Sequence, residues 1–258
     1  MPDFYANIGL FFYICNLIRK VMGIPDIIIA VDGFSATGKS TFAKMVAAEF
    51  GFLYLDSGAM YRGVTLHAME NGMAADGTID EAALRPSLEG LDLHFRHDDG
   101  ATKLFLGDRC IEEDIRTLAV SSLVSPVATI PFVRNYVDDR LHAFSEGGRV
   151  IMDGRDIGTT VFPNAELKVF MTAEPAVRAQ RRYDEMVAKG EPADLEAVMR
   201  NLEERDYIDS HRETSPLRRP EDAFVMDNTH MTLHEELVWV LGVIQGKFGL
   251  LEAPALTH

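Results

Sequence analysis

The sequence predicts an α/β fold in which helices cover both faces of a parallel central sheet. Apolar strands alternate with helical segments along most of the 258 residues, as in a three-layer α/β/α domain. The first strand, 27–31, leads through a glycine-rich loop into a helix over 41–50. Between residues 91 and 116, apolar and polar residues alternate instead, which predicts a small antiparallel sheet set into the α/β chain.

The loop after the first strand fits the spacing G-x-x-x-x-G-K-[ST] at every fixed position. Its residues are Gly33, Phe34, Ser35, Ala36, Thr37, Gly38, Lys39 and Ser40, and the helix continues from Thr41. Glycines that adopt positive φ let consecutive N–H groups point into one concavity, which cradles phosphate oxygens. Lys39 is expected to reach the β- and γ-phosphates, and the Ser40 hydroxyl to hold Mg²⁺.

The charge of the chain argues against nucleic acid as a partner. The formal net charge is −15, whereas binding to a nucleic-acid backbone needs a basic surface. An acidic chain that binds phosphate must concentrate its cations locally, so clustered arginines become informative. Cys15 and Cys110 are too few and too isolated for a disulfide framework or a zinc site, which favours a cytoplasmic location.

Residues 1–24 form an apolar-rich N-terminal extension ahead of the first strand. The run 8–18 is shorter than the roughly 20 apolar residues that span a bilayer. Its basic residues, Arg19 and Lys20, follow the apolar run instead of preceding it as in a signal peptide. We interpret Met22 as the natural start and expect no membrane partner. A membrane-tethered module that uses 8–18 is the alternative.

The second strand, 52–56, leads directly into a helix. Asp56 ends the strand, and Ser57 caps a helix that carries Tyr61 and Arg62. We expect Arg62 close to the carboxyl end of a strand, where ligands bind in open α/β sheets. The alternative for Arg62 is a solvated helix arginine.

Three extended pieces are expected in the inserted sheet, with turns at 98–100 and 107–108. The alternating apolar residues are Leu91, Leu93, Phe95, Leu104 and Leu106, and the third piece carries Cys110, Glu112 and Asp114. Residues 120–142 are expected to be helical, with interruptions at Pro126 and Pro131. This helical segment carries Ser125, Arg134 and Arg140.

A second stretch with candidate functional residues covers 149–161. A buried strand, 150–152, ends at Asp153, which is the pattern of a carboxylate that holds Mg²⁺ through water in phosphate-loop proteins. Arg155 and Asp156 follow at once and place a cation and a carboxylate beside it. The alternative for these two charges is a surface ion pair.

The last part of the chain is rich in arginine. A strand over 167–172, a helix from Pro175, a final strand over 224–226 and a closing helix over 232–248 are expected. The arginines of this part include Arg178, Arg181, Arg182, Arg200, Arg205, Arg212, Arg218 and Arg219. We interpret the segment 199–217 as a mobile cover that closes on phosphates. A salt-bridged exposed helix is the alternative.

These stretches together resemble the bacterial cytidylate kinases, nucleoside-monophosphate kinases of the phosphate-loop class. The resemblance covers about residues 25–248 and combines the glycine loop with three further motifs. They are Asp56-Ser57-Gly58-Ala59-Met60-Tyr61-Arg62, Asp153-Gly154-Arg155-Asp156-Ile157-Gly158-Thr159, and Glu204-Arg205-Asp206 with Asp209 and Arg212. The resemblance implies transfer of the γ-phosphate of ATP to CMP or dCMP. It also implies a kinase domain over 25–258, with a nucleoside-monophosphate-binding insert at about 58–146 and a lid at about 183–219.

The resemblance implies a role for each matching residue. Ser57, Ser125, Arg134 and Asp156 match the set that reads cytosine, and Arg62, Arg155 and Arg212 match the arginines around the CMP phosphate. Arg205 and Asp209 match residues near the ribose hydroxyls, Arg181 matches the arginine near the ATP adenine, and Tyr61 forms a wall of the nucleoside pocket. Lys39, Arg155 and Arg212 are the expected catalytic residues, and Ser40 and Asp153 the expected Mg²⁺ site. The implied enzyme is a cytoplasmic monomer.

One departure from the family pattern bears on the geometry of the loop and not on the function, and alternative functions stay open beside it. Ala36 stands where the family loop usually has glycine, and its Cβ narrows the backbone choices. A kinase for UMP, uridine or shikimate on the same scaffold is the nearest alternative. A nucleotide-dependent switch is less consistent with the sequence, because the chain has no N-K-x-D segment to read guanine.

Overall fold

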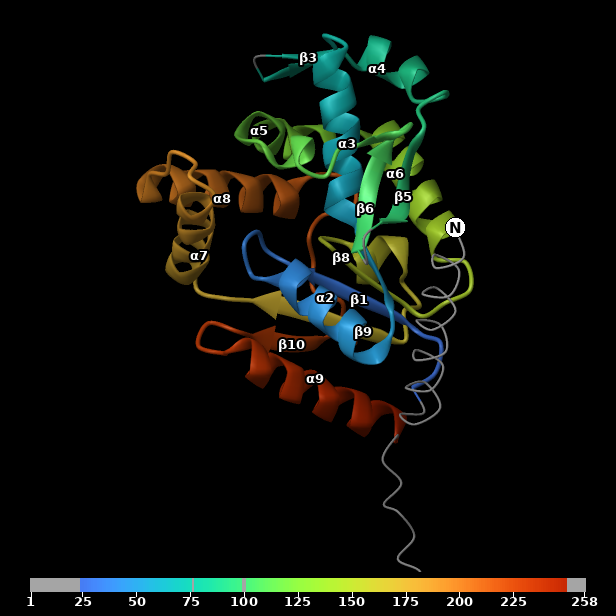
Figure 1. Cartoon of the computed structure of the whole chain (residues 1–258), viewed down its shortest axis with the longest axis vertical. Coiled ribbons are helices and arrows are strands. Elements are labelled where there is room, and N and C mark those ends of the chain that lie inside the picture. Colours follow the sequence, from blue (N-terminus) through green and yellow to red (C-terminus); the bar gives the residue numbers. More distant parts are fainter. Residues whose placement is uncertain (1–23, 76, 99–100, 250–258) are drawn as a thin grey trace, which may run out of the picture.

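The computed structural model describes residues 24–75, 77–98 and 101–249, and within them five parallel strands form the central sheet (Figure 1). The strands are β1 (Ile28–Gly33), β2 (Leu53–Asp56), β8 (Val150–Gly154), β9 (Leu167–Thr172) and β10 (Phe224–Asp227). Their spatial order is β10-β9-β1-β8-β2. The predicted parallel α/β sheet is confirmed.

Strand β1 occupies the centre of this sheet. Its register pairs Val31 with Asp153 of β8 on one side and with Val169 of β9 on the other. The apolar run of β1 is buried because helices cover both faces of a parallel sheet. The parallel register brings the residues that follow β1 and β8 to the same edge of the sheet.

Helices cover both faces of the sheet and form two apolar cores. One core joins α2 (Lys39–Phe50) and α9 (Leu233–Phe248) to the sheet, with Phe42, Phe50 and Val240 fully buried. The other joins α3 (Ser57–Glu70) and α6 (Pro131–Phe144) to the opposite face. This is the predicted three-layer α/β/α arrangement.

The chain between β2 and β8 carries a separate small sheet, as predicted. Strands β5 (Leu93–Asp98), β6 (Ala101–Leu106) and β7 (Arg109–Cys110) pair antiparallel in that order. A hairpin of β3 (Ala74–Ala75) and β4 (Thr78–Ile79) and the short helix α4 (Glu81–Ser87) precede them. Figure 1 shows this part of the chain above the main sheet, around α3.

Two predicted boundaries in this insert are wrong. The third extended piece ends at Cys110, and Asp114 lies in a short 3₁₀ helix, η1 (Asp114–Arg116), rather than in a strand. Pro126 lies inside the last turn of α5 (Leu118–Val127), and Pro131 starts α6. The helical segment is therefore broken once, between the two prolines. Pro131 does not interrupt α6, because proline is accepted in the first turn of a helix. Residues 99–100 of the predicted turn lie outside the described residues.

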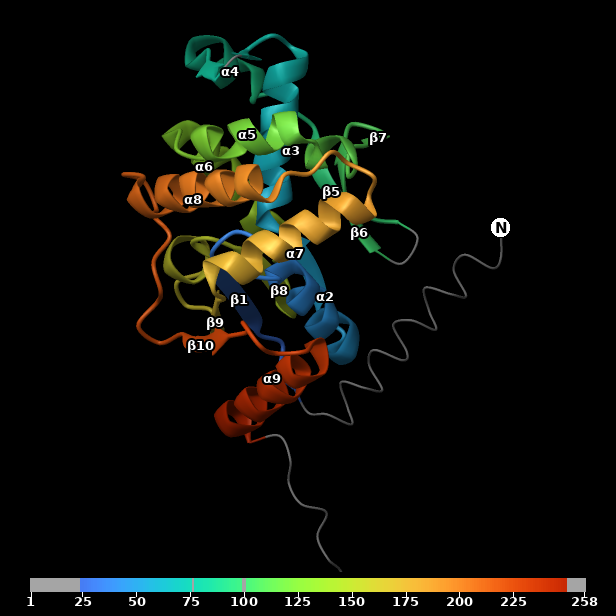
Figure 2. The ribbon, with the colours of Figure 1, turned by 90° about the vertical axis from the view of Figure 1, so that its left-hand side faces the viewer.

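Two helices form a smaller unit beside the carboxyl edge of the sheet. Helices α7 (Pro175–Ala188) and α8 (Leu195–His211) lie against each other in Figure 2 and bury Ala179 and Leu202 between them. Helix α8 starts four residues before the predicted 199 and ends six before 217. Asp194 sets the start, because its side chain accepts a hydrogen bond from the backbone N–H of Glu196.

The N-terminal extension, including the run 8–18 and Met22, lies outside the described residues. The interpretation of Met22 as the natural start therefore stays a prediction. Within 24–75, 77–98 and 101–249, none of the helices combines the length and the apolar character that a membrane crossing requires.

Arg149 connects three elements at the amino edge of the main sheet. Its guanidinium donates hydrogen bonds to the carbonyl oxygens of Phe50 and Gly51, at the end of α2, and of Ile24, ahead of β1 (2.5, 2.9 and 3.1 Å). Its own carbonyl oxygen accepts from the N–H of Leu53 at 2.9 Å. A cation is favourable at this position because the carboxyl end of a helix carries partial negative charge.

We expect Arg149→Ala to lower the free energy of unfolding by about 2–3 kcal/mol, because it removes charged donors from three carbonyl groups. Chemical denaturation followed by circular dichroism measures the change. Arg200→Ala is the matched control, since Arg200 pairs with Glu196 at 3.6 Å on an exposed helix face, and a change within about 0.5 kcal/mol is expected. Equal losses in the two variants would contradict the structural role of Arg149.

Candidate active site

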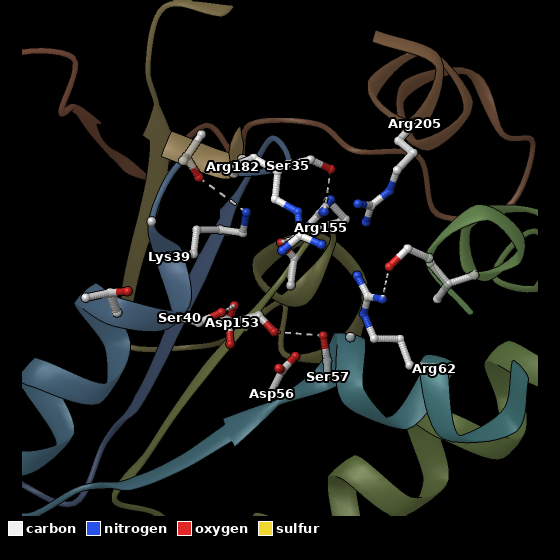
Figure 3. Close-up of a pocket in the computed structure, with 18 of the residues that line it drawn as sticks. Ser35, Lys39, Ser40, Asp56, Ser57, Arg62, Asp153, Arg155, Arg182 and Arg205 are labelled. Carbon is white, nitrogen blue, oxygen red and sulfur yellow. Dashed lines mark hydrogen bonds between the residues drawn. The ribbon is translucent and has the colours of Figure 1, made fainter. Parts of the chain in front are cut away.

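A cleft of about 870 Å³ opens at the carboxyl edge of the main sheet. The glycine loop and the start of α2 form one wall, and the ends of β2 and β8 form the floor. Side chains of α3 and α5 line one end, and those of α7 and α8 close over the cleft. Figure 3 shows side chains from these separate segments converging on a common centre. The cleft is large enough for two small ligands side by side.

The glycine loop has the backbone conformation that a phosphate cradle requires. Gly33 has φ 151° and Gly38 has φ 91°. A Cβ on Gly33 would lie 2.1 Å from the carbonyl oxygen of Met171 in β9, so only glycine fits there. Ala36 also has a positive φ, 58°, which explains why glycine is usual at this position. The loop keeps its shape at the cost of a strained alanine.

Lys39 stands at the start of α2 with its ammonium group inside the glycine loop. Its Nζ donates to the carbonyl oxygen of Phe34 at 2.5 Å and to Oγ1 of Thr37 at 3.3 Å. The residue is only 5 % exposed. Burial lowers the pKa of Lys39, and so does the nearby Arg155. An anion in the cleft would remove this penalty, because it would compensate the buried positive charges.

Ser40 and Asp153 meet between the glycine loop and the end of β8. The Ser40 hydroxyl donates to Oδ2 of Asp153 at 2.9 Å, and the Tyr54 hydroxyl donates to Oδ1 at 2.8 Å. Burial and the neighbouring Asp56 raise the pKa of Asp153. The Ser40 hydroxyl and the Asp153 carboxylate, with the negative charge of Asp56 nearby, form a suitable set of oxygen donors for Mg²⁺. This ion usually keeps several of its waters when it binds to protein.

Arg62 and Arg205 face the centre of the cleft from opposite sides (Figure 3). Arg62 donates to Oγ of Ser121 at 2.9 Å, and within the described part of the chain Nε of Arg205 is buried without a hydrogen-bond partner. Burial and Arg205 lower the pKa of Arg62 to about 9, and burial and Arg155 lower that of Arg205 to about 10. Crowded, partly uncompensated guanidinium groups form a binding site for an anion such as phosphate.

Arg155 lies between the glycine loop and α8. Its Nε donates to Oδ2 of Asp209 at 2.9 Å, and its NH2 group donates to Oγ of Ser35 at 2.9 Å. Burial raises the pKa of Asp209, but Arg155, Arg212 and Arg205 outweigh burial and lower it. Asp209 therefore stays ionised and holds Arg155 in place through their ion pair.

Asp156 is a buried carboxylate with an arginine on each oxygen. Its Oδ1 accepts from Arg212 at 2.8 Å, and its Oδ2 accepts from Arg134. The Arg134 guanidinium also lies 5.3 Å from the centre of the Tyr61 ring. Asp156 and Arg212 line the cleft with Ser57 and Tyr61. Together these groups form a polar slot with an aromatic wall, which is suited to a hydrogen-bonding base.

Most of the residues singled out in the sequence line this one cleft. They are Ser35, Ala36, Thr37, Gly38, Lys39, Ser40, Thr41, Ser57, Tyr61, Arg62, Ser125, Asp153, Arg155, Asp156, Arg181, Arg205, Asp209 and Arg212. Gly33, Phe34 and Arg134 are absent from the lining. Gly33 supports the loop from behind, Phe34 supplies a carbonyl oxygen to Lys39, and Arg134 acts on the cleft through Asp156.

Sequence reasoning assigned no role to two polar residues, Asn228 in the cleft lining and Asp206 beside it. Asn228 donates to the carbonyl oxygen of Thr37 at 2.8 Å and accepts from Arg181 at 3.1 Å. Asp206 accepts from the backbone N–H of Ser35 at 3.1 Å and also pairs with Arg178. Asn228 directly follows strand β10, so its place at a carboxyl strand end was a usable signal. Asp206 carried no such signal, since α8 alternates charges along its length.

Comparison with known proteins finds relatives over most of the chain. The sequence profile described as cytidylate kinase matches residues 29–245. A cytidylate kinase of Parabacteroides distasonis is 49 % identical over 220 residues, which cover 84 % of this chain and 96 % of the relative. Cytidylate kinases of Bacteroides thetaiotaomicron and Porphyromonas gingivalis are 46 % and 48 % identical, and cover 84 % and 83 % of this chain and 96 % and 94 % of their own lengths. The chain belongs to the cytidylate kinase family.

Proposed function

We propose that this protein transfers the γ-phosphate of ATP to CMP or dCMP and yields ADP with CDP or dCDP. Membership of the cytidylate kinase family supports the reaction. The observation that carries it is one cleft in which a glycine loop with its lysine faces a cluster of arginines and a polar base slot. A second phosphate site opposite the donor loop distinguishes a nucleotide kinase from a nucleotide-dependent switch.

The donor side of the cleft is assigned to ATP. The N–H groups of the loop and of the first turn of α2 would hold the phosphates, and Lys39 would move from the carbonyl of Phe34 to the β- and γ-phosphates. Arg181, which Asn228 holds beside Thr37, is assigned to the adenine side.

The acceptor side is assigned to the nucleoside monophosphate. Arg62, Arg155 and Arg212 would bind its phosphate. Arg205, whose charge adds to this cluster, would lie with Asp209 near the ribose. Ser57, Ser125, Arg134 and Asp156 would read the base. Cytosine presents an amino donor where uracil presents a carbonyl oxygen, so a carboxylate at that place favours cytosine and leaves uracil unpaired.

Ser40 and Asp153 would hold Mg²⁺ beside the donor phosphates. When bound, the ion would neutralise charge on these phosphates. The residues fit such an ion because the Ser40 hydroxyl and the Asp153 carboxylate already lie 2.9 Å apart at the end of the loop, and Mg²⁺ prefers one or two carboxylates plus phosphate oxygens.

The reaction needs position and charge more than covalent chemistry. The acceptor phosphate is already a nucleophile near neutral pH, so the protein supplies no general base. Lys39 and the arginines on both sides of the cleft would hold donor and acceptor in line and neutralise the transferred group. Closure of the helices above the cleft would exclude water, which competes as an acceptor.

The same assignment divides the chain into working parts. The segment 58–146 is proposed to bind the monophosphate, and the segment 183–219, which includes α8, is proposed to act as the lid within a kinase domain over 25–258. These assignments rest on the contributions of α3, α5 and α8 to the cleft. The expected cytoplasmic location and the expected monomeric state stay predictions.

ATP consumption with each acceptor in turn tests the function. We expect rapid ADP formation with CMP and dCMP, slower formation with UMP, and background rates with uridine and shikimate. Removal of Mg²⁺ by a chelator is expected to abolish phosphate transfer to CMP. Hydrolysis at the same slow rate with and without any acceptor would instead indicate a switch.

Arg155→Ala and Arg212→Ala are each expected to lower kcat by at least about a hundredfold, on the scale of arginine contributions to phosphoryl transfer. Steady-state ADP formation with saturating CMP measures the loss. Arg200→Ala, on an exposed face of the same lid segment, is expected to keep wild-type turnover. Near-normal turnover in both site variants would contradict the assignment of these arginines.

Asp156→Ala is expected to reduce the preference for CMP over UMP by about tenfold or more, because the proposed acceptor for the cytosine amino group is lost. Competition between the two acceptors measures the ratio. Asp138→Asn is the control and is expected to keep the wild-type ratio of CMP to UMP. Asp138 lies 3.5 Å from the Tyr61 hydroxyl but does not line the cleft. A ratio that is unchanged in Asp156→Ala would rule out a base-reading role.

A further inference from the structure

Asp32 is a buried carboxylate that none of the proposed steps uses. It is the penultimate residue of β1, next to the first glycine of the phosphate loop, and only 1 % of it is exposed. Its side chain points to the segment that follows β8 rather than to the glycine loop. Oδ1 accepts from the backbone N–H of Ile157 at 2.8 Å, and Oδ2 accepts from that of Gly158 at 2.7 Å.

These two N–H groups belong to the first turn of a π-helix, η2 (Ile157–Val161), which begins directly after Asp156. Burial raises the pKa of Asp32 to about 7, and the N–H groups of Gly158 and Ile157 offset only part of this effect. The side chain of Asp32 supplies acceptors to these two donors, which have no partner within the turn.

The contact lies one residue beyond the acceptor residues Arg155 and Asp156. In the sheet register, Asp32 pairs with Gly154, so β1 and β8 hold one end of the segment 154–158 and the Asp32 side chain holds the other. Between these two attachments stand the arginine assigned to the CMP phosphate and the carboxylate assigned to the base.

Gly158 permits the close approach of this turn to Asp32. A Cβ there would lie 3.1 Å from Cδ of Lys168 and from Cγ of Pro220, and 3.3 Å from Oδ2 of Asp32. An added methyl group would press on the carboxylate and on the side chains of Lys168 and Pro220 together.

We propose that Asp32 is a positioning residue that fixes the segment carrying Arg155 and Asp156 against the phosphate loop, and thereby sets affinity and base selectivity at the acceptor site. The inference rests on the proposed function, since it assigns the acceptor site to CMP. The carboxylate touches no substrate. It acts through the backbone of Ile157 and Gly158, and it links the strand that precedes the donor loop to the segment that holds the acceptor.

Steady-state kinetics of Asp32→Ala and Asp32→Asn test the proposal. In Asp32→Ala we expect KM for CMP to rise by about tenfold or more, the scale of leaving buried N–H donors without an acceptor. The preference for CMP over UMP should fall, while KM for ATP stays within about twofold. Asp32→Asn keeps one accepting oxygen and should give intermediate values. Gly158→Ala should shift KM for CMP in the same direction.

Val240→Ala is the control for general loss of stability. Val240 is fully buried between α9 and the main sheet, away from this turn, and its truncation lowers stability without touching the segment 154–158. At assay temperatures with equal fractions of folded protein, this variant should keep wild-type KM for CMP and wild-type selectivity.

Three outcomes would overturn the inference. One is wild-type KM for CMP and wild-type selectivity in Asp32→Ala, or in Asp32→Asn if the alanine variant does not fold. Another is an equal rise of KM for ATP, which would place the effect in the phosphate loop. A third is the same change in Val240→Ala. A wild-type protein that does not phosphorylate CMP at all would overturn the proposed function itself, which makes the two failures distinguishable.

Discussion

The parallel pairing of β1 with β8 is the constraint on which the rest of the site depends. It places Val31 opposite Asp153, so that the glycine loop and the Asp153–Asp156 segment leave the sheet side by side. Neighbouring strands lie about 5 Å apart, which puts a phosphate-binding loop and a charged segment within reach of the same ligand. The chemistry of the cleft follows from this geometry, because the side chains at both strand ends are charged or hydrogen-bonding.

The cleft concentrates positive charge in a protein whose net charge is negative. A net charge of −15 repels nucleotides at long range, yet the cleft gathers Lys39 and several arginines in a partly buried space. Two buried aspartates hold arginines in one orientation: Asp156 accepts from Arg212 and Arg134, and Asp209 accepts from Arg155. The remaining positive charge at Arg62 and Arg205 is compensated only weakly, which is the condition for binding phosphate strongly.

Helices α7 and α8 contribute contacts that connect donor and acceptor sides. Asp206 accepts the N–H of Ser35 in the glycine loop, and Asp209, one turn further along α8, holds Arg155. Residues three apart lie on the same face of a helix, so one helix touches both sides of the cleft at once. A ligand on either side of the cleft would therefore lie against contacts made by the same helix.

The sequence by itself determined the α/β class, the strand–loop–helix unit and the residue types of the site, because these depend on local spacing. The glycine spacing of the loop and the apolar run of β1 can each be recognised within a few consecutive residues. Tertiary structure alone decided that Asp206 reaches Ser35, that Asp32 holds the turn after Asp156, and that Arg134 acts through Asp156. Those contacts join residues far apart in the chain, and their geometry depends on how strands and helices pack. Ala36 shows the difference between the two kinds of information. The sequence marked an alanine at this position as unusual, and only the structure showed that the position has a positive φ, which favours glycine.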